Sequence, residues 1–253
     1  MTMSQDVGAR RFRYFDLIMA GFVAVLLCAN LIGPAKVCEI SLPIVLPLIG
    51  ASLVFGAGNI FFPISYIFGD ILTEVYGYAR ARKVIWAGFA AMIFATVMTQ
   101  TVLHMPASPS EPFNAQLQPA LETVFGNTWR IVVASIVAFW VGDFVNAYIL
   151  ARMKVRMRGR HLWMRTIGST VIGQGIDSLL FYPIAFYGLW DNSTLFSVLL
   201  FNWCFKVAIE ALMTPATYVA VGFLKRKEGI DYYDDGTDFS PFTLEDDSWR
   251  GPK

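Results

Sequence analysis

The chain has 253 residues, of which 56% are hydrophobic and only 15% are charged, and its formal net charge is +1. An average soluble domain carries roughly 25% charged residues, so an ordinary water-soluble enzyme is excluded. The net charge is close to zero, which argues against a nucleic-acid-binding protein, because such proteins carry an excess of basic residues. The 7 Trp, 10 Tyr and 21 Phe residues exclude a disordered chain. Six spans of about 20 residues each would use about half of the chain, which predicts a single polytopic, all-α integral membrane protein.

The sequence contains few residues that could bind a metal or a cofactor. The three cysteines, Cys28, Cys38 and Cys204, lie far apart and form no C-x-x-C pair. The two histidines, His104 and His161, fall in predicted loops, and no glycine-rich phosphate loop is present. We therefore expect neither a metal nor a cofactor.

Six apolar runs are predicted to be transmembrane helices. The first begins at Phe15 after three arginines, and it is too long for a signal peptide and lacks a small-x-small cleavage site. The predicted helices cover residues 15–33, 58–77, 84–103, 129–150, 166–190 and 194–224. Together they form a single six-helix transmembrane domain over residues 1–230.

The remaining segments are predicted from their composition. Prolines and glycines interrupt residues 41–55, which we expect to be re-entrant or interfacial and covered by protein, since irregular backbone is not tolerated in lipid. Residues 104–128 contain four prolines and are predicted to be a loop. Residues 231–253 carry seven acids and have the composition of a solvated, acidic cytoplasmic tail.

The basic residues predict the orientation, because Lys and Arg near span ends stay cytoplasmic. With the N-terminus inside, 15 basic residues lie on the cytoplasmic side, and only Lys36 and Arg130 lie opposite. The cytoplasmic clusters are residues 10–13, 80–83, 152–165 and 225–227. This asymmetry requires an even number of crossings between clusters and favours six helices with both termini cytoplasmic.

Six ionisable side chains fall inside the predicted spans. Each costs about 2.5 to 3.5 kcal/mol in hydrocarbon, so each must face a cavity or a partner. One interpretation is that they are separate polar residues that hold helices together. Acids on four different spans favour a shared polar site instead. The six are Asp70, Glu74, Asp143, Asp177, Lys206 and Glu210.

Two predicted helices carry polar residues one turn apart. Asp70 and Glu74 are four residues apart and share a helix face with Tyr66. The last predicted helix has an unbroken polar stripe that must face inward. It consists of Asn202, Lys206, Glu210 and Thr214.

Carboxylates and amides are paired on two further helices. Asp143 precedes Asn146 by three residues, and Gln174 precedes Asp177 by three, while Asn30 adds an amide on the first helix. Carboxylates accept hydrogen bonds, amides donate and accept them, and nearby aromatic rings can stack. This combination favours a small, planar, polar heterocycle as the ligand.

The run GDILTEVYGYARARK, residues 69–83, followed by Trp86, Gly88 and Phe89, closely resembles the signature of the queuosine precursor transporter family, formerly grouped with vitamin uptake transporters. The resemblance implies a multi-pass bacterial inner-membrane carrier for 7-cyano-7-deazaguanine or its aminomethyl analogue, precursors of queuosine in transfer RNA. Where many members carry Gln-x-x-Asp on the fourth helix, this chain has the acid Asp143 before the amide Asn146. Further similar positions are Asn30, Arg165, Ser169, Gln174, Asp177, Lys206, Glu210, Pro215, Tyr218 and residues 233–242.

The resemblance and the residue chemistry together suggest roles. Asp143 or Asp177 would accept from the donor edge of the base, as acids do in base recognition, and Asp70 and Glu74 would bind a proton or gate transport. Glu74 would otherwise be paired to a basic residue at the end of its helix. Lys206 and Glu210 would form an ion pair or contact the substrate. The substrate-binding candidates are Asn30, Tyr66, Asp143, Asn146, Gln174 and Asp177, and the helix-end basic residues are Arg80, Arg82 and Lys83.

Two other functions are compatible with the pattern. The chain contains no ATP-binding motif, so it is driven by a gradient or by metabolic trapping, or it is a substrate-capturing subunit that needs a separate ATPase. An intramembrane enzyme would use Asp143 and Asp177 as a carboxylate dyad. The expected partners are a deazapurine and the lipid bilayer, not nucleic acid, and a homodimer is compatible with the sequence.

Overall fold

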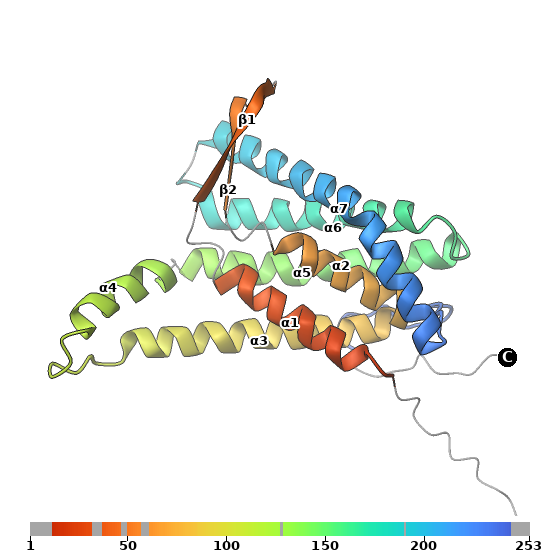
Figure 1. Ribbon diagram of the computed structural model, residues 1–253, viewed down its shortest axis with the longest axis horizontal. Coiled ribbons are helices and arrows are strands. Elements are labelled where there is room, and N and C mark those ends of the chain that lie inside the picture. Colours follow the sequence, from red (N-terminus) through yellow and green to blue (C-terminus); the bar gives the residue numbers. More distant parts are fainter. Residues whose placement is uncertain are drawn as a thin grey trace, which may run out of the picture.

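The computed structural model describes residues 12–31, 37–46, 50–56, 61–126, 129–189 and 191–243. Long helices lie side by side, with α1 and α2 crossing over the others (Figure 1). In chain order the elements are α1 (Phe15–Leu31), β1 (Val37–Leu46), β2 (Gly50–Gly56), α2 (Phe62–Ile71), η2 (Leu72–Tyr76), α3 (Tyr78–His104), α4 (Asn114–Phe125), α5 (Trp129–Arg156), α6 (Leu162–Phe186) and α7 (Asn192–Glu228).

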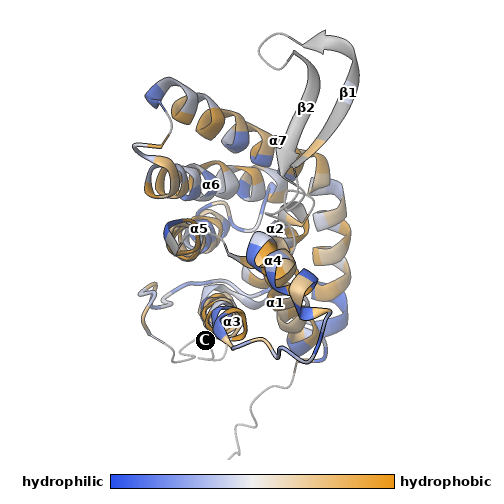
Figure 2. Ribbon diagram, turned by 90° about the vertical axis from the view of Figure 1, so that its left-hand side faces the viewer, coloured by the Kyte–Doolittle hydropathy of each residue, from blue (hydrophilic) through white to orange (hydrophobic). Residues whose placement is uncertain are grey.

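Three of the described helices are long and apolar enough to cross a membrane, namely residues 78–104, 130–156 and 192–228, and α1 is a shorter apolar helix. Hydrophobic residues make up much of the length of these helices (Figure 2), and large side chains such as Phe94, Leu212 and Val219 are exposed. Outward-facing apolar surface of this extent is stable in lipid rather than in water. The protein is therefore a helical membrane protein, as the sequence predicted.

The closest helix contact brings α5 and α6 together through glycine. A Cβ added at Gly173 would lie 2.8 Å from the Asn146 Cβ, and one added at Gly142 would lie 2.9 Å from the Asp177 Cβ. Small residues let helix backbones approach in this way. The same contact places Asn146 opposite Gly173 and Asp177 opposite Gly142 at the α5–α6 interface.

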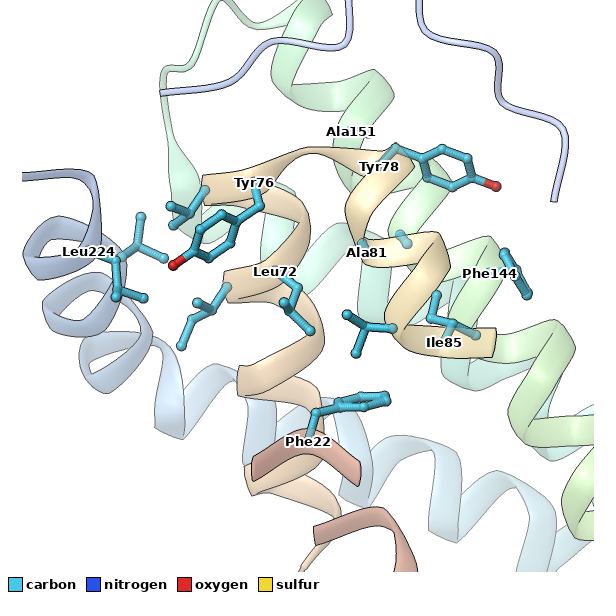
Figure 3. Close-up of a cluster of buried hydrophobic side chains, with 14 of the residues drawn as sticks. Phe22, Leu72, Tyr76, Tyr78, Ala81, Ile85, Phe144, Ala151 and Leu224 are labelled. Atoms are coloured by element: carbon cyan, nitrogen blue, oxygen red, sulfur yellow. The ribbon is translucent and has the colours of Figure 1, made fainter. Parts of the chain in front are cut away.

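The hydrophobic core surrounds the short π-helical segment η2. Leu72 and Tyr76 of η2 pack with Phe22 of α1, Ile85 of α3 and Leu224 of α7 (Figure 3). Because side chains from these three other elements cover it, η2 is held at the centre of the bundle, and the polar residues Asp70 and Glu74 on α2 and η2 are buried with it.

The chain turns sharply between η2 and α3. Gly77 has a φ of 86°, and a Cβ there would lie 2.2 Å from the Tyr232 ring. Glycine is suited to this position because it adopts positive φ without steric cost and leaves room for the ring. The predicted helix over residues 58–77 is thus α2 followed by η2, and it ends at this turn.

The all-α expectation is wrong at residues 41–46 and 50–55, which form β-strands. Residues 47–49 lie outside the described residues, and a re-entrant or interfacial location of residues 41–55 stays a prediction. β1 and β2 form an antiparallel hairpin in which Val37 pairs with Gly56 and Ser41 with Ser52. The two strands satisfy each other's backbone hydrogen bonds, which the proline and glycine pattern did not reveal. Strand-forming Val, Ile and Leu residues on both sides of the turn favour the pairing.

The predicted loop over residues 104–128 contains helix α4. Within α4, the Gln118 amide donates to Glu122 at 2.7 Å, and it also donates to the Leu103 carbonyl oxygen of α3 at 3.0 Å. Of the four prolines, only Pro119 lies inside the helix. The sequence of α4 does place Leu117, Leu121 and Val124 at helical spacing, but the four prolines in residues 104–128 favour a loop instead.

The beginning of the acidic tail is packed rather than solvated. We call residues 231–243 the C-terminal strap. Both Asp234 carboxylate oxygens accept from the Tyr78 N–H at the start of α3, at 3.1 and 3.2 Å, and the Trp86 indole donates to the Pro241 carbonyl oxygen at 2.7 Å. Composition predicts a solvated tail because it does not show that a helix N-terminus, which binds anions, lies opposite Asp234.

Candidate substrate site and charge clamp

Helix α2 and segment η2 carry three polar side chains into the bundle. Tyr66, Asp70 and Glu74 follow one another at four-residue spacing and are all buried. The segment packs against α1, α3, α5 and α7. Each of the three side chains therefore faces a neighbouring helix rather than lipid.

Hydrogen bonds join the two side chains on α2, Tyr66 and Asp70, to α6 and α5. The Tyr66 hydroxyl donates to Gln174 Oε1 at 2.8 Å, and the Asn146 amide donates to Asp70 Oδ1 at 3.1 Å. Four of the predicted site residues, from three helices, are thus joined in two hydrogen-bonded pairs, and their role in substrate binding stays a prediction.

A narrow pocket lies beside these hydrogen bonds. Its volume has room for about one water molecule, so a bicyclic base requires its walls to move apart. Asp143 of α5 is among the lining residues, so the wall contains a carboxyl group that can accept hydrogen bonds. The polar residues of the lining are Ser65, Tyr66, Thr73, Asp143 and Asn146.

The predicted ion pair between Lys206 and Glu210 is not formed. Lys206 Nζ instead lies 2.6 Å from Asp177 Oδ2, across the α6–α7 interface. An i,i+4 pair with the lysine first is the weaker orientation on a helix, and the long lysine side chain reaches the carboxylate of the adjacent helix. Within the described part of the chain, neither carboxyl oxygen of Glu210 has a hydrogen-bond partner.

Glu74 belongs to a second cluster, which we call the charge clamp: Glu74, Lys154, Arg165, Lys225 and Asp231. Arg165 contacts both Glu74 carboxylate oxygens, and Lys225 Nζ lies 2.6 Å from Glu74 Oε1. Lys154 Nζ lies 3.6 Å from the same oxygen and donates to the Glu74 carbonyl oxygen at 2.5 Å. The clamp therefore ties η2 to α5, α6 and α7.

Asp231 links the clamp to the C-terminal strap. Its Oδ1 lies 2.6 Å from Lys154 Nζ and 2.8 Å from Lys225 Nζ. Partial burial alone would raise the pKa of Asp231, but the hydrogen bonds from Lys154 and Lys225 outweigh burial and lower it. Asp231 is therefore ionised near neutral pH and holds the strap to the bundle.

Asp70 and Glu74, for which a joint gating or proton-binding role was predicted, lie in different surroundings, and the role itself stays a prediction. Three cations surround Glu74, whereas an amide donates to Asp70. Pairing of Glu74 with the helix-end basic residues does not occur either: Arg80 donates to the Tyr76 carbonyl oxygen and Arg82 to those of Asp238 and Ser240.

Asn30 is not brought to the pocket. Its amide donates to the Leu26 carbonyl oxygen of its own helix at 2.9 Å. Lys154 and Lys225, in contrast, were recognised only as cytoplasmic charges that set the orientation. One feature of the sequence indicates that they lie near Glu74. Both lysines come shortly after predicted spans, at the end expected to be cytoplasmic, and Glu74 lies near the same end of its own span.

Apolar helices that enclose amides, carboxylates and a narrow polar pocket define a membrane protein with a buried polar site. Residues 56–220 match the family described as "Putative vitamin uptake transporter". The chain belongs to the queuosine precursor transporter family, within this vitamin uptake transporter group, which is a family of transporters rather than enzymes.

Curated relatives support the same family. The chain is 30% identical over 199 residues to the "Probable queuosine precursor transporter" of Bacillus subtilis strain 168, which covers 78% of this chain and 84% of the relative. It is 24% identical over 177 residues to the "Queuosine precursor transporter" of Escherichia coli K12, covering 68% and 73%. No solved structure matches the chain.

Proposed function

We propose that the chain imports 7-cyano-7-deazaguanine or its aminomethyl analogue across the bacterial inner membrane, with six crossings and both termini in the cytoplasm. The observation that carries this proposal is the hydrogen-bonded set of Tyr66, Gln174, Asp70 and Asn146 beside the pocket, within the part of the chain that matches the family. The printed names of the relatives supply the substrate class.

The pocket chemistry suits a guanine-like edge. Adjacent N–H donors of such a base pair well with a carboxylate, and Asp143 lines the pocket. The amides of Asn146 and Gln174 can donate to a ring carbonyl. Because the pocket is narrow, binding requires that α2 move relative to α5, a motion consistent with alternating access around a central site.

Genetic complementation tests the substrate. A strain that lacks both de novo synthesis of the precursor and its own importer should regain queuosine in transfer RNA when it expresses this protein and receives nanomolar 7-cyano-7-deazaguanine. If recovery requires high external base with or without the protein, the proposal is wrong. Competition by the aminomethyl analogue, guanine and queuine then defines selectivity.

Reconstitution separates a carrier from a substrate-capturing subunit. The purified chain alone, in liposomes, should accumulate or equilibrate the base. Binding without transport would favour the alternative in which a separate ATPase supplies energy.

Cysteine labelling tests the topology. In a background without native cysteines, Ala107→Cys and Arg156→Cys, both at exposed positions, should react with an impermeant thiol reagent from opposite sides. Reaction of both from one side would contradict six crossings. Arg156 is a better cytoplasmic position than Gly159, where a Cβ would lie 2.1 Å from the Tyr233 hydroxyl oxygen.

A further inference from the structure

Two fully buried acids outside the charge clamp lack the partners that a buried charge requires. Asp70 on α2 and Glu210 on α7 have no exposed surface. Among the described residues, Asp70 Oδ2 and both carboxyl oxygens of Glu210 have no hydrogen-bond partner. A buried polar atom without a partner costs about 1 to 3 kcal/mol, and more if it is charged, so three such oxygens in one place need an explanation.

The two acids face each other. Helices α2 and α7 pack together, and the Glu210 carboxyl lies within hydrogen-bonding reach of the Asp70 carboxyl. Two ionised carboxylates cannot form a hydrogen bond, because neither has a donor. A single proton between them provides that donor and removes one of the two charges.

The surrounding groups do not neutralise the pair. The cations near Asp70 and Glu210 already form ion pairs with other acids. Lys206 pairs with Asp177, and the cations of the charge clamp pair with Glu74. The other groups that face Asp70 and Glu210 carry negative charge or none. The titratable and charged groups around the pair are Tyr66 on α2, Glu74 on η2, Asp143 on α5, Asp177 on α6 and Lys206 on α7.

We propose that Asp70 and Glu210 share one proton and that this pair is the proton-binding site of the transporter. The Asn146 amide already donates to Asp70 Oδ1, which marks Asp70 as the acceptor. Glu210 carries the proton and donates to Asp70 Oδ2, so that two of the three unpartnered oxygens are satisfied. The hydrogen bond holds α2 against α7.

The position of the pair connects the proton to the pocket; this step rests on the proposed function. Asp70 lies one helical turn from Tyr66, and its partner Asn146 lines the pocket. Release of the proton to the cytoplasm leaves two adjacent negative charges, whose repulsion separates α2 from α7. The same displacement moves Tyr66 away from Gln174 and opens the space that a base needs.

Thermal unfolding of the full chain in detergent tests the shared proton without any substrate. As the pH rises from about 6 to about 9, loss of the proton should lower the melting temperature of the wild-type protein by several degrees. Asp70→Asn and Glu210→Gln each replace one acid by a neutral amide that can donate in place of the proton. Both variants should lose this pH dependence, whereas Glu122→Gln on exposed α4 should retain it.

An infrared measurement keeps the inference testable if a variant does not fold. The wild-type protein at about pH 7 should show the carbonyl band of a neutral carboxylic acid, and the Glu122→Gln variant should show the same band. A wild-type spectrum without that band overturns the proposal. The proposal is also overturned if the melting temperatures of Asp70→Asn and Glu210→Gln change with pH as that of the wild-type protein does.

Uptake into proteoliposomes then tests the coupling. An inward proton gradient should increase uptake by the wild-type protein and by Glu122→Gln, and the increase should vanish in Glu210→Gln. Wild-type uptake that ignores the gradient overturns the coupling. If no deazaguanine is taken up by any variant, the proposed function fails, while the melting and infrared results still decide whether the proton is shared.

Discussion

Tyr66 and Gln174, which are 108 positions apart in the sequence, are joined by a 2.8 Å hydrogen bond between α2 and α6. This bond closes one side of the polar pocket, because Tyr66 is also part of the pocket lining. It gives a buried tyrosine hydroxyl an acceptor and a buried amide oxygen a donor. The pocket and the helix contact therefore depend on the same atoms.

Removing the Tyr66 hydroxyl should weaken both substrate binding in the pocket and the contact between α2 and α6. Tyr66→Phe leaves Gln174 Oε1 buried without a donor, which costs about 1 to 3 kcal/mol. We expect a lower melting temperature and a higher KM for base uptake. Tyr187→Phe, at an exposed tyrosine, is the matched control, and an equal effect of the two changes would contradict a role for the bond.

Neutralising Glu74 should destabilise the protein strongly. Glu74→Gln leaves Arg165, Lys154 and Lys225 without the acid that they surround. Breaking a buried ion pair costs about 3 to 5 kcal/mol. Thermal unfolding in detergent measures the loss, with Glu122→Gln as the surface control. A melting temperature close to that of the wild-type protein would show that the clamp contributes little.

The ion pair between Lys206 and Asp177 gives a double-mutant prediction. Lys206→Met leaves a carboxylate in the α6–α7 interface without its cation, so protein yield and melting temperature should fall. Adding Asp177→Asn removes the uncompensated charge and should restore part of the loss, whereas adding Glu210→Gln should not. A stable Lys206→Met protein that cannot transport would instead assign Lys206 to the substrate.

The close contact between α5 and α6 should not tolerate a methyl group. In Gly173→Ala the new Cβ would lie 2.8 Å from the Asn146 Cβ and 3.0 Å from the Gly142 carbonyl oxygen. Overpacking of this kind costs about 1 to 3 kcal/mol. Gly222→Ala on α7, where nothing lies within 4 Å, changes helix propensity alone. Unfolding measurements that rank the two variants in the opposite order would refute the contact.

Acid should release the C-terminal strap. Because the pKa of Asp231 is lowered in the folded protein, its ion pairs stabilise the strap above the ordinary aspartate value of about 3.9. That stabilisation is lost as the pH falls through the lower folded value. The protection of residues 231–243 against hydrogen exchange, taken relative to the intrinsic exchange rate at each pH, should therefore fall below about pH 4. In Asp231→Asn the exchange should already be faster at neutral pH.

The helices were predictable because their apolar runs are long. The predicted span over residues 166–190 corresponds to α6 at Leu162–Phe186, shifted by four residues at each end. The hairpin was not predictable, since its stability comes from pairing between Val37 and Gly56 or Ser41 and Ser52, and the intervening prolines resemble irregular backbone. Strand pairing depends on cross-strand neighbours, which a local pattern does not contain.

The inward orientation of the polar side chains was predictable from the sequence, but their partners were not. Burial cost alone indicated that Asp70, Asp177 and Glu210 face inward. Which atom each one contacts depends on helix rotation and side-chain reach, so the partner of Lys206 was assigned to its own helix instead of to α6. Periodicity gives the face of a helix, and only the packed bundle gives the partner across it.

The strap also has a consequence for how the protein is made. Tyr78 begins α3, yet the carboxylate that accepts its backbone N–H comes from Asp234, 156 positions later. Chains grow from the N-terminus, at roughly 5 to 20 residues per second. The third helix therefore enters the bilayer with its first turn uncapped, and that turn stays so until every later membrane helix has left the ribosome.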